Sequence, residues 1–169
     1  MDVTKAILSR RSIRKYTDKL VSDSDLEALL IAAMHAPSAV NEQLWHFVVI
    51  KNRNALREVS RLIRTAPMAK YATVAIVVCG NKNLEKFPGL WVLDCSAAAE
   101  NILIEAAGRR LGAVWTAVYP FEGRVNAIKD LLDLPANVIP LCIIPVGHPA
   151  ETLAPVDRFN PSRIHYDNW

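Results

Sequence analysis

The chain has 169 residues, of which 51% are hydrophobic, and its 20 Lys and Arg against 17 Asp and Glu leave a net charge of +3. This length supports one sizeable core and is short for two, so we expect a single domain over residues 1–169. The small net charge excludes a protein that binds nucleic acid through its overall field, and no stretch approaches the roughly 20 apolar residues that span a membrane.

The first part of the chain predicts two helices, a loop and a strand. Apolar spacing predicts a short helix within residues 3–10, and the polar run at 22–25 predicts the capped start of a second helix. Pro37 cannot continue that helix, so we expect it to end just before this residue and to lead into a loop over 37–43. A strand should follow over 45–50.

The middle of the chain is more apolar. We expect a third helix over about 54–64, a buried β-branched strand over 73–78 and a loop over 82–89. Residues 90–111 then form a long segment with almost no polar face, which predicts a buried helix or one that packs against a partner subunit. Gly112 is expected to end it as a C-cap.

After the long helix we expect a short strand over 113–117, a helix over 122–132 and a strand over 138–146. Pro140 predicts that this last strand is irregular or lies at a sheet edge. Residues 148–169 form a Pro-rich tail. The order of elements indicates an α/β or α+β sheet layered by helices, which by itself identifies no chemistry.

Common catalytic and metal motifs are missing. The sequence has no dinucleotide-binding glycine fingerprint, no phosphate-binding P-loop and no hydrolase nucleophile elbow. Cys79, Cys95 and Cys142 are far apart, odd in number and set in apolar stretches, so we expect buried thiols without a disulfide. The four histidines form no zinc-binding pair, and no metal is expected. Asp2, Lys5 and Arg10 also interrupt the segment where a signal peptide needs its apolar run, which favours a cytoplasmic protein.

Three polar islands stand out from the apolar background. The run Arg-Arg-Ser-Ile-Arg at 10–14 is a dense set of donors suited to a phosphate, although such a run is also typical of a solvated helix end. The second island is the loop Pro-Ser-Ala-Val-Asn-Glu-Gln-Leu-Trp at 37–45. The third is Arg158 in the tail. A basic nucleic-acid module is an alternative explanation for the first island alone.

Together these islands resemble the nitroreductase family of FMN-dependent NAD(P)H oxidoreductases, in a compact short form. The resemblance extends over essentially the whole chain. It is carried, in order, by RRSIRKY, APSAVNEQLWHF, LGAVWT after the long helix, and VGHP followed by DRFNPSRIHYDNW.

The resemblance implies a three-layer α/β/α sandwich of the α+β class, with a mixed, mainly antiparallel sheet and a long buried central helix. It also implies an intertwined homodimer with two FMN molecules between the subunits. The flavin contacts it implies are Arg10, Ser12, Arg14 and Arg158 at the phosphate and ribityl edge, Arg11 on the ribityl and pyrimidine side, Pro37, Ser38, Ala39, Asn41 and Gln43 from the other subunit, and the backbone of Thr116, Ala117 and Val118 near the ring.

The implied activity is hydride transfer from NADH or NADPH to flavin N5, followed by reduction of a small acceptor such as a nitroaromatic or a quinone. No catalytic side chain is expected. The alternative is a flavin carrier, sensor or flavin-modifying relative without nicotinamide turnover. Two departures from the family matter: Leu44 stands where the family usually has Pro, and the short segment 80–89 favours an open pocket.

Several of these residues have a purely structural alternative. Trp45 and Trp115 are expected to pack in the core rather than stack on the flavin. Ser38 and Asn41 are also ordinary turn residues. Arg163 competes with Arg158 for the phosphate contact.

Overall fold

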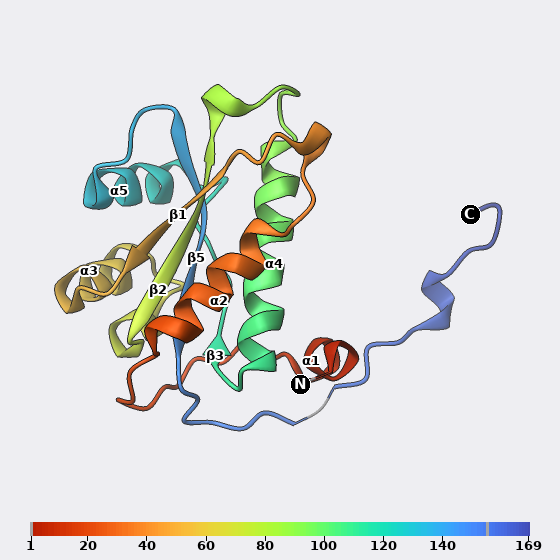
Figure 1. The fold of residues 1–169 in the computed structure, drawn as a ribbon, viewed down its shortest axis with the longest axis horizontal. Helices are drawn as coiled ribbons and strands as arrows, with labels where there is room; N and C mark the ends of the chain where they lie inside the picture. The colour runs from red at the N-terminus through yellow and green to blue at the C-terminus, as the bar shows by residue number, and fades with distance from the viewer. Residues whose placement is uncertain (1, 155) are drawn as a thin grey trace.

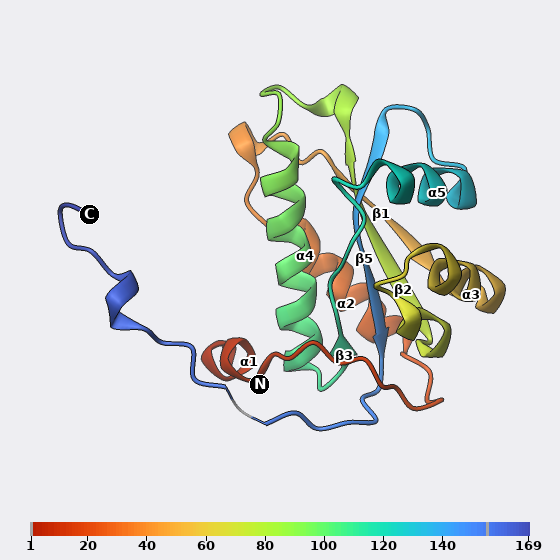
Figure 2. The same cartoon turned by 180° about the vertical axis from the view of Figure 1, so that it is seen from behind.

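A computed structural model describes residues 2–154 and 156–169 and shows three layers (Figure 1). A five-stranded sheet lies in the middle, and two helices cover each of its faces. These are α2 (Asp23–Met34) and α4 (Trp91–Gly108) on one face, and α3 (Arg53–Leu62) and α5 (Glu122–Leu132) on the other. The short α1 (Val3–Ser9) packs against α4, at the end of the molecule where α4 stops (Figure 2). The expected α/β/α layering is confirmed.

The sheet is built around two long central strands. Its order is β1 (Trp45–Ile50), β2 (Val74–Asn81), β5 (Val138–Gly147) and β3 (Gly112–Ala113), and β4 (Thr116–Ala117) also pairs with β5. All of these strand pairs are antiparallel. A parallel bridge between Ser12 and Ala113 adds the N-terminal segment to the edge, so the sheet is mixed but mainly antiparallel, as expected.

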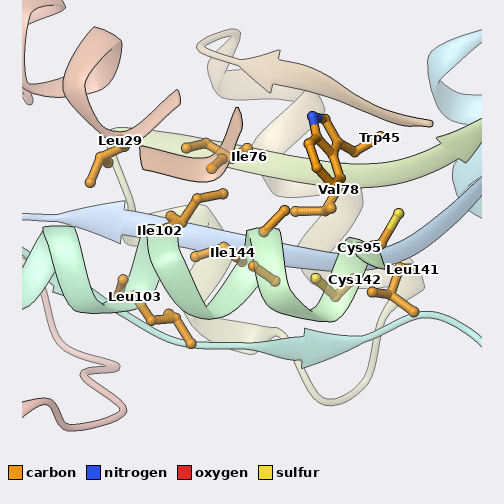
Figure 3. Packing of buried hydrophobic residues seen from close by; sticks show 14 of the residues in the cluster. Leu29, Trp45, Ile76, Val78, Cys95, Ile102, Leu103, Leu141, Cys142 and Ile144 are labelled. Atoms are coloured by element: carbon orange, nitrogen blue, oxygen red, sulfur yellow. The ribbon is translucent and has the colours of Figure 1, made fainter. Parts of the chain in front are cut away.

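The two central strands are apolar on both faces because both faces are covered by helices. Successive side chains of a strand point to opposite faces, and β2 divides its residues in this way between two cores. Val74, Ile76 and Val78 belong to the core under α2 and α4, whereas Ala75, Val77 and Cys79 belong to the core under α3 and α5. Figure 3 shows the first core, in which Leu29 and Ile102 from the helices surround Ile76 and Ile144 from the strands.

Pro140 lies in a central strand at a β-bulge, so the expected irregularity is confirmed and the alternative of an edge position is wrong. Val78 pairs with Cys142 while its neighbour Cys79 pairs with Pro140, which leaves Leu141 as an extra residue. The bulge breaks the alternation, and Leu141 and Cys142 both belong to the core beneath α4. A proline is tolerated here because a bulge disrupts the ladder locally.

The long helix ends earlier than the sequence predicts. Its last residue is Gly108 and its C-cap is Arg109, so the expected C-cap at Gly112 is wrong. Arg110 takes the left-handed conformation with φ 60°, and the amide of Leu111 closes the end by donating to the carbonyl of Ala106. Gly112 is therefore free to begin β3. The single strand expected over 113–117 is divided into β3 and β4.

The described residues include no helix long and apolar enough to cross a membrane. They also contain no group of three or more His, Cys, Asp and Glu side chains that could hold a metal ion. Cys79, Cys95 and Cys142 are buried and free, as expected.

We predict that Ile102→Ala, in the middle of α4, lowers the free energy of unfolding by about 2 to 5 kcal/mol. Ile102 is fully buried, and the smaller side chain leaves a cavity that a close-packed core cannot fill. Denaturant unfolding at a fixed protein concentration measures the loss. Leu20→Ala, at a side chain that is 75% exposed, is the control and should change stability by less than about 0.5 kcal/mol. Equal losses for the two variants would contradict this packing.

Candidate functional site

The basic segment at 10–17 lies along one end of the sheet, between β3 and the chain that follows β5. The amide of Ile13 donates to the carbonyl of Ala113 at 3.0 Å. On the other side, the amide of Ala150 donates to the carbonyl of Lys15 at 2.9 Å. The segment is therefore held as an extra edge of the sheet and is not a freely solvated helix end.

Two paired glycines make this close approach possible. Gly112 and Gly147 face each other in the β3–β5 ladder. A Cβ atom at Gly112 would lie 2.6 Å from Ile13 Cγ2, and one at Gly147 would lie 2.9 Å from the Tyr16 ring. Real Cβ atoms essentially never come so close, so only glycine leaves room for the segment.

Tyr16 holds the middle of the segment through its hydroxyl group. Its hydroxyl lies 2.7 Å from the carbonyl oxygen of Ile13 and 3.2 Å from that of Pro145, and it can donate to either. Burial raises the pKa of Tyr16 well above its usual value, which keeps the hydroxyl protonated as a donor.

The three arginines of the segment have different surroundings. Arg10 Nε lies 3.3 Å from Glu100 Oε1 on α4, in an ion pair. Arg11 links the basic segment to neighbouring backbone, since its guanidinium donates to the carbonyls of Leu8 and Ala154 at 3.0 and 3.2 Å. Arg14 donates to the carbonyl of Ser12 at 3.2 Å. In the described residues no carboxylate forms an ion pair with the Arg14 guanidinium, so its charge is available to a ligand.

Glu151 orients the backbone beside Arg14. Its Oε1 accepts hydrogen bonds from the amides of Arg14 and Lys15 at 2.7 and 3.1 Å. Because both amide groups point at this carboxylate, the segment has one defined path across the end of the sheet.

A pocket of about 790 Å³ opens beside this segment. Ser12 and Arg14, two of the predicted flavin contacts, line it together with Lys15. The opposite wall comes from the 3₁₀ turn η2 (Pro67–Tyr71), which supplies Lys70 and the half-exposed ring of Tyr71. The pocket therefore combines three cationic side chains, a hydroxyl and an aromatic ring with one carboxylate, that of Glu151, which accepts from the Arg14 and Lys15 amides.

The η2 wall is the part of the site that the sequence patterns do not predict. The ammonium of Lys70 lies 4.9 Å from the centre of the Tyr71 ring, a cation–π distance. The available signal was a Lys-Tyr pair just before a buried strand, where a polar and an aromatic side chain reach the sheet end together. It carries no periodicity, and the residues lie more than fifty positions from the 10–14 run.

The 37–43 loop is tightly turned. The amide of Gln43 donates to Ser38 Oγ at 3.1 Å, so Ser38 caps the turn. Asn41 and Gln43 have positive φ values of 56° and 47°, and Val40, a β-branched residue, has 44°. Non-glycine residues seldom adopt this left-handed conformation, so contacts outside the loop must hold it there.

The loop and the basic segment lie at opposite ends of α4 in the same chain (Figure 1). The loop contacts the beginning of α4, where the amide of Ala39 donates to Asp94 Oδ1 at 3.0 Å. A shallow pocket of about 280 Å³ separates Pro37, Ser38 and Ala39 from the exposed side chain of Leu93. The basic segment instead lies near the end of α4. One chain therefore does not bring these two predicted halves of the site together.

Residues 116–118 form the β4 edge. The Thr116 hydroxyl donates to the carbonyl of Ile143 at 2.6 Å, and the Thr116 and Val118 side chains are buried. Ala117 is partly exposed, and Arg124 donates to its carbonyl at 2.9 Å. A small residue at this position leaves the backbone approachable.

The end of the tail extends away from the body of the molecule, beyond the position of α1 (Figures 1 and 2). All of residues 157–169 are exposed. In the described residues, neither Arg158 nor Arg163 has a side-chain hydrogen bond or ion pair with the 10–14 segment, and the hydrogen bonds of residues 157–169 are local, as between Phe159 and Asp157. Trp45 is buried in the core, as expected.

Large apolar side chains are exposed on α1, α2, α4 and the tail. Single exposed residues are ordinary, whereas larger exposed apolar patches are typical of interaction surfaces. The exposed side chains are Val3, Ile7 and Leu8 on α1, Ile31 and Met34 on α2, Leu93 on α4, and Phe159, Tyr166 and Trp169 in the tail.

Known proteins resemble this chain both in sequence and in fold. The model of the nitroreductase family matches residues 7–77 and 62–148. A protein of Methanothermobacter thermautotrophicus, whose name includes NAD(P)H nitroreductase, is 50% identical over all of this chain and 88% of its own length. A crystal structure from Parabacteroides distasonis, with the same words in its name, superimposes with a TM-score of 0.95 at 39% identity and covers 99% of this chain and 98% of its own. A nitroreductase structure from Desulfovibrio desulfuricans in complex with FMN has a TM-score of 0.85 at 28% identity and covers 100% and 98%.

We predict that Gly112→Ala moves the basic segment off the sheet. The new Cβ would overlap Ile13, so the hydrogen bond from the Ile13 amide to Ala113 should weaken and stability should fall by about 1 to 3 kcal/mol. Amide hydrogen exchange measures this directly as faster exchange at Ile13. Gly123→Ala in α5, where a Cβ meets nothing within 4 Å, is the matched control and should stabilise by about 0.5 to 1 kcal/mol. Unchanged exchange at Ile13 in the Gly112 variant would contradict the role of the paired glycines.

Proposed function

The chain belongs to the nitroreductase family, and we propose that this FMN-dependent NAD(P)H oxidoreductase reduces nitroaromatic, quinone or related small acceptors by a ping-pong mechanism. The observation that carries the proposal is the pocket beside the basic segment. It combines anion-binding side chains with an aromatic wall in one space of about 790 Å³. A flavin mononucleotide needs both, because one of its ends is a phosphate and the other a flat ring.

The residues of this pocket fit the cofactor. The guanidinium of Arg14 and the hydroxyl of Ser12 are donors suited to phosphate oxygens. Lys15 and Lys70 add positive charge that would stabilise negative charge on a reduced flavin. Met68 and Tyr71 offer apolar surface to a ring. Arg10 does not line this pocket, and it would have to leave its ion pair with Glu100 to reach the phosphate.

FMN, when bound, supplies the redox chemistry by taking hydride from NADH or NADPH and giving electrons to the second substrate. The chain's own task is to bind, orient and screen. Fixed donors lower the cost of charge development because they need no reorganisation during the reaction. Thr116, Ala117 and Val118 do not line this pocket. No side chain of this chain is assigned as nucleophile or general base.

We place the site between two copies of the chain. The 37–43 loop lies at the far end of α4 from the basic segment of its own chain, so Ser38, Ala39, Asn41 and Gln43 would contact the flavin held by a second copy. The exposed apolar residues of α1, α2, α4 and the tail support a homodimer, which would cover them. The tail would bring Arg158 or Arg163 to the phosphate.

The first test is an absorbance titration of the flavin-free protein with FMN, followed by anaerobic addition of NADH or NADPH. We expect micromolar or tighter binding, bleaching by at least one nicotinamide and recovery of the yellow colour with a quinone or nitroaromatic. A protein that binds no FMN would overturn the proposal. Binding without bleaching would instead identify a flavin carrier or sensor.

The second test asks whether the site is shared. Arg14→Ala removes charge-assisted hydrogen bonds worth about 1.5 to 3 kcal/mol, so FMN affinity should fall about tenfold to a hundredfold. A loop variant with both Asn41→Ala and Gln43→Ala should also bind FMN weakly. Mixed dimers of the two variants, isolated with two different tags, should regain one site of wild-type affinity, because one of their two sites receives an intact half from each chain.

Arg57→Ala on α3, away from the pocket, is the control for loss of an arginine. If both halves of the site came from the same chain, every site in the mixed dimer would carry one defect. No affinity would then be regained, and the shared arrangement would be refuted.

A further inference from the structure

Two buried carboxyl groups hold the 37–43 loop against the beginning of α4. Asp94 on α4 is 6% exposed and Glu42 in the loop is 9% exposed. Asp94 Oδ1 accepts a hydrogen bond from the amide of Ala39 at 3.0 Å. Glu42 Oε2 accepts one from the amide of Lys86 at 2.7 Å. Each carboxyl group thus ties the loop to another part of the chain with one of its two oxygens.

The other two oxygens have no hydrogen-bond donor. Asp94 Oδ2 and Glu42 Oε1 are buried without a donor among the described residues. The two carboxyl groups are neighbours, because the Ala39 amide that donates to Asp94 belongs to the same turn as Glu42, whose own amide donates to the Ala39 carbonyl at 3.0 Å. Two carboxylates cannot donate to one another, and two like charges buried side by side are strongly unfavourable. A single proton between them removes both problems.

The surroundings of the pair favour keeping that proton. Burial raises the pKa of Asp94 most, and the negative charges of Glu42 and Glu85 raise it further, whereas the Ala39 amide acts in the opposite direction. Glu85 forms an ion pair with Lys82 and accepts hydrogen bonds from the amides of Gly89 and Trp91. The Lys82 charge is therefore used by Glu85 and does not neutralise the Asp94–Glu42 pair.

We propose that Glu42 and Asp94 share one proton and act as positioning residues that hold the 37–43 loop in the shape that meets the flavin of the partner subunit. The second half of this statement rests on the proposed function. The shape needs such a hold, because Val40, Asn41 and Gln43 all have positive φ values and flank Glu42 on both sides. A hydrogen-bonded pair at this point of the loop supplies the contacts that hold the strained backbone in place.

The proton makes the loop sensitive to pH in one direction. Because the folded pKa of Asp94 is raised, the contribution of the pair to stability is fully present in acid and is lost as the pH rises through that pKa. Above it, two buried carboxylates repel each other and the loop loosens. FMN affinity should then fall by up to about tenfold per pH unit, the limit for one linked proton.

Infrared spectroscopy tests the proton without any cofactor. The wild-type protein should keep the C=O stretch of a protonated carboxyl, shifted in heavy water, at pH values where exposed carboxyl groups are ionised. Asp94→Asn and Glu42→Gln should each abolish the band. Each amide can still accept from its backbone partner and can donate its N–H to the remaining carboxylate, so both variants should fold. Glu58→Gln on the surface of α3 is the control and should retain the band.

Flavin titrations across the pH range test the positioning role. The wild type should bind FMN more weakly as the pH rises, whereas Asp94→Asn and Glu42→Gln should bind it with a flatter pH profile, since their hydrogen bond needs no titratable proton. Glu42→Ala, which leaves the Lys86 amide and Asp94 Oδ2 without partners, should bind FMN more weakly at every pH. Conservative rescue by Gln and loss with Ala separates positioning from mere bulk.

The outcomes are distinct. A wild-type spectrum without the protonated band, or a band that survives both amide variants, would overturn the shared proton. A band that behaves as expected, with pH profiles of FMN binding that are the same in wild type and amide variants, would overturn the positioning role. A protein that shows the band but binds no FMN would overturn the proposed function and with it the positioning role, while the shared proton would stand.

Discussion

The fold depends on one constraint: the central strands β2 and β5 have no polar face, so each face of the sheet must be covered along its whole length. Helices α2 and α4 cover one face and α3 and α5 cover the other. Because one side of α4 packs on the sheet along its length, the two ends of the helix remain free to contact segments without regular secondary structure. The 37–43 loop occupies one end and the basic segment occupies the other. The positions of both halves of the candidate site thus follow from the need to bury two strands.

Much of this fold could be predicted from residue patterns alone. The β-branched run of β2 and the polar start of α2 are strong local signals, and both elements lie where expected. The elements that differ from the prediction have long-range causes. Gly112 has the residue type of a helix C-cap, but it is glycine because Ile13, ninety-nine positions earlier in the chain, packs on its backbone. Pro140 is compatible with an edge strand or with an irregular strand. The sequence does not decide between the two, because the bulge that accommodates this proline depends on the pairing of β5 with β2.

The candidate site was only partly legible in the sequence. Ser12 and Arg14 are predictable because they belong to a dense basic motif, and the pocket contains both. Lys70 is not predictable, because a short 3₁₀ turn has no periodic pattern. Glu42 and Asp94 look like ordinary surface acids, since burial depends on tertiary packing and leaves no mark on a single charged letter. That the 37–43 loop and the basic segment lie apart is a property of the three-dimensional chain, and no spacing in the sequence indicates it.

Because these two segments are separated along α4, formation of an active protein takes two stages. In the proposed arrangement, a single folded chain presents two half-sites and no complete one. The first stage, folding, depends on the core that the chain builds for itself. The second, assembly of a working site, depends on how often chains meet and therefore on their concentration. Dilution would abolish the activity of such a protein although every helix and strand remained in place. The number of complete sites would therefore depend on the concentration of the chain in the cell.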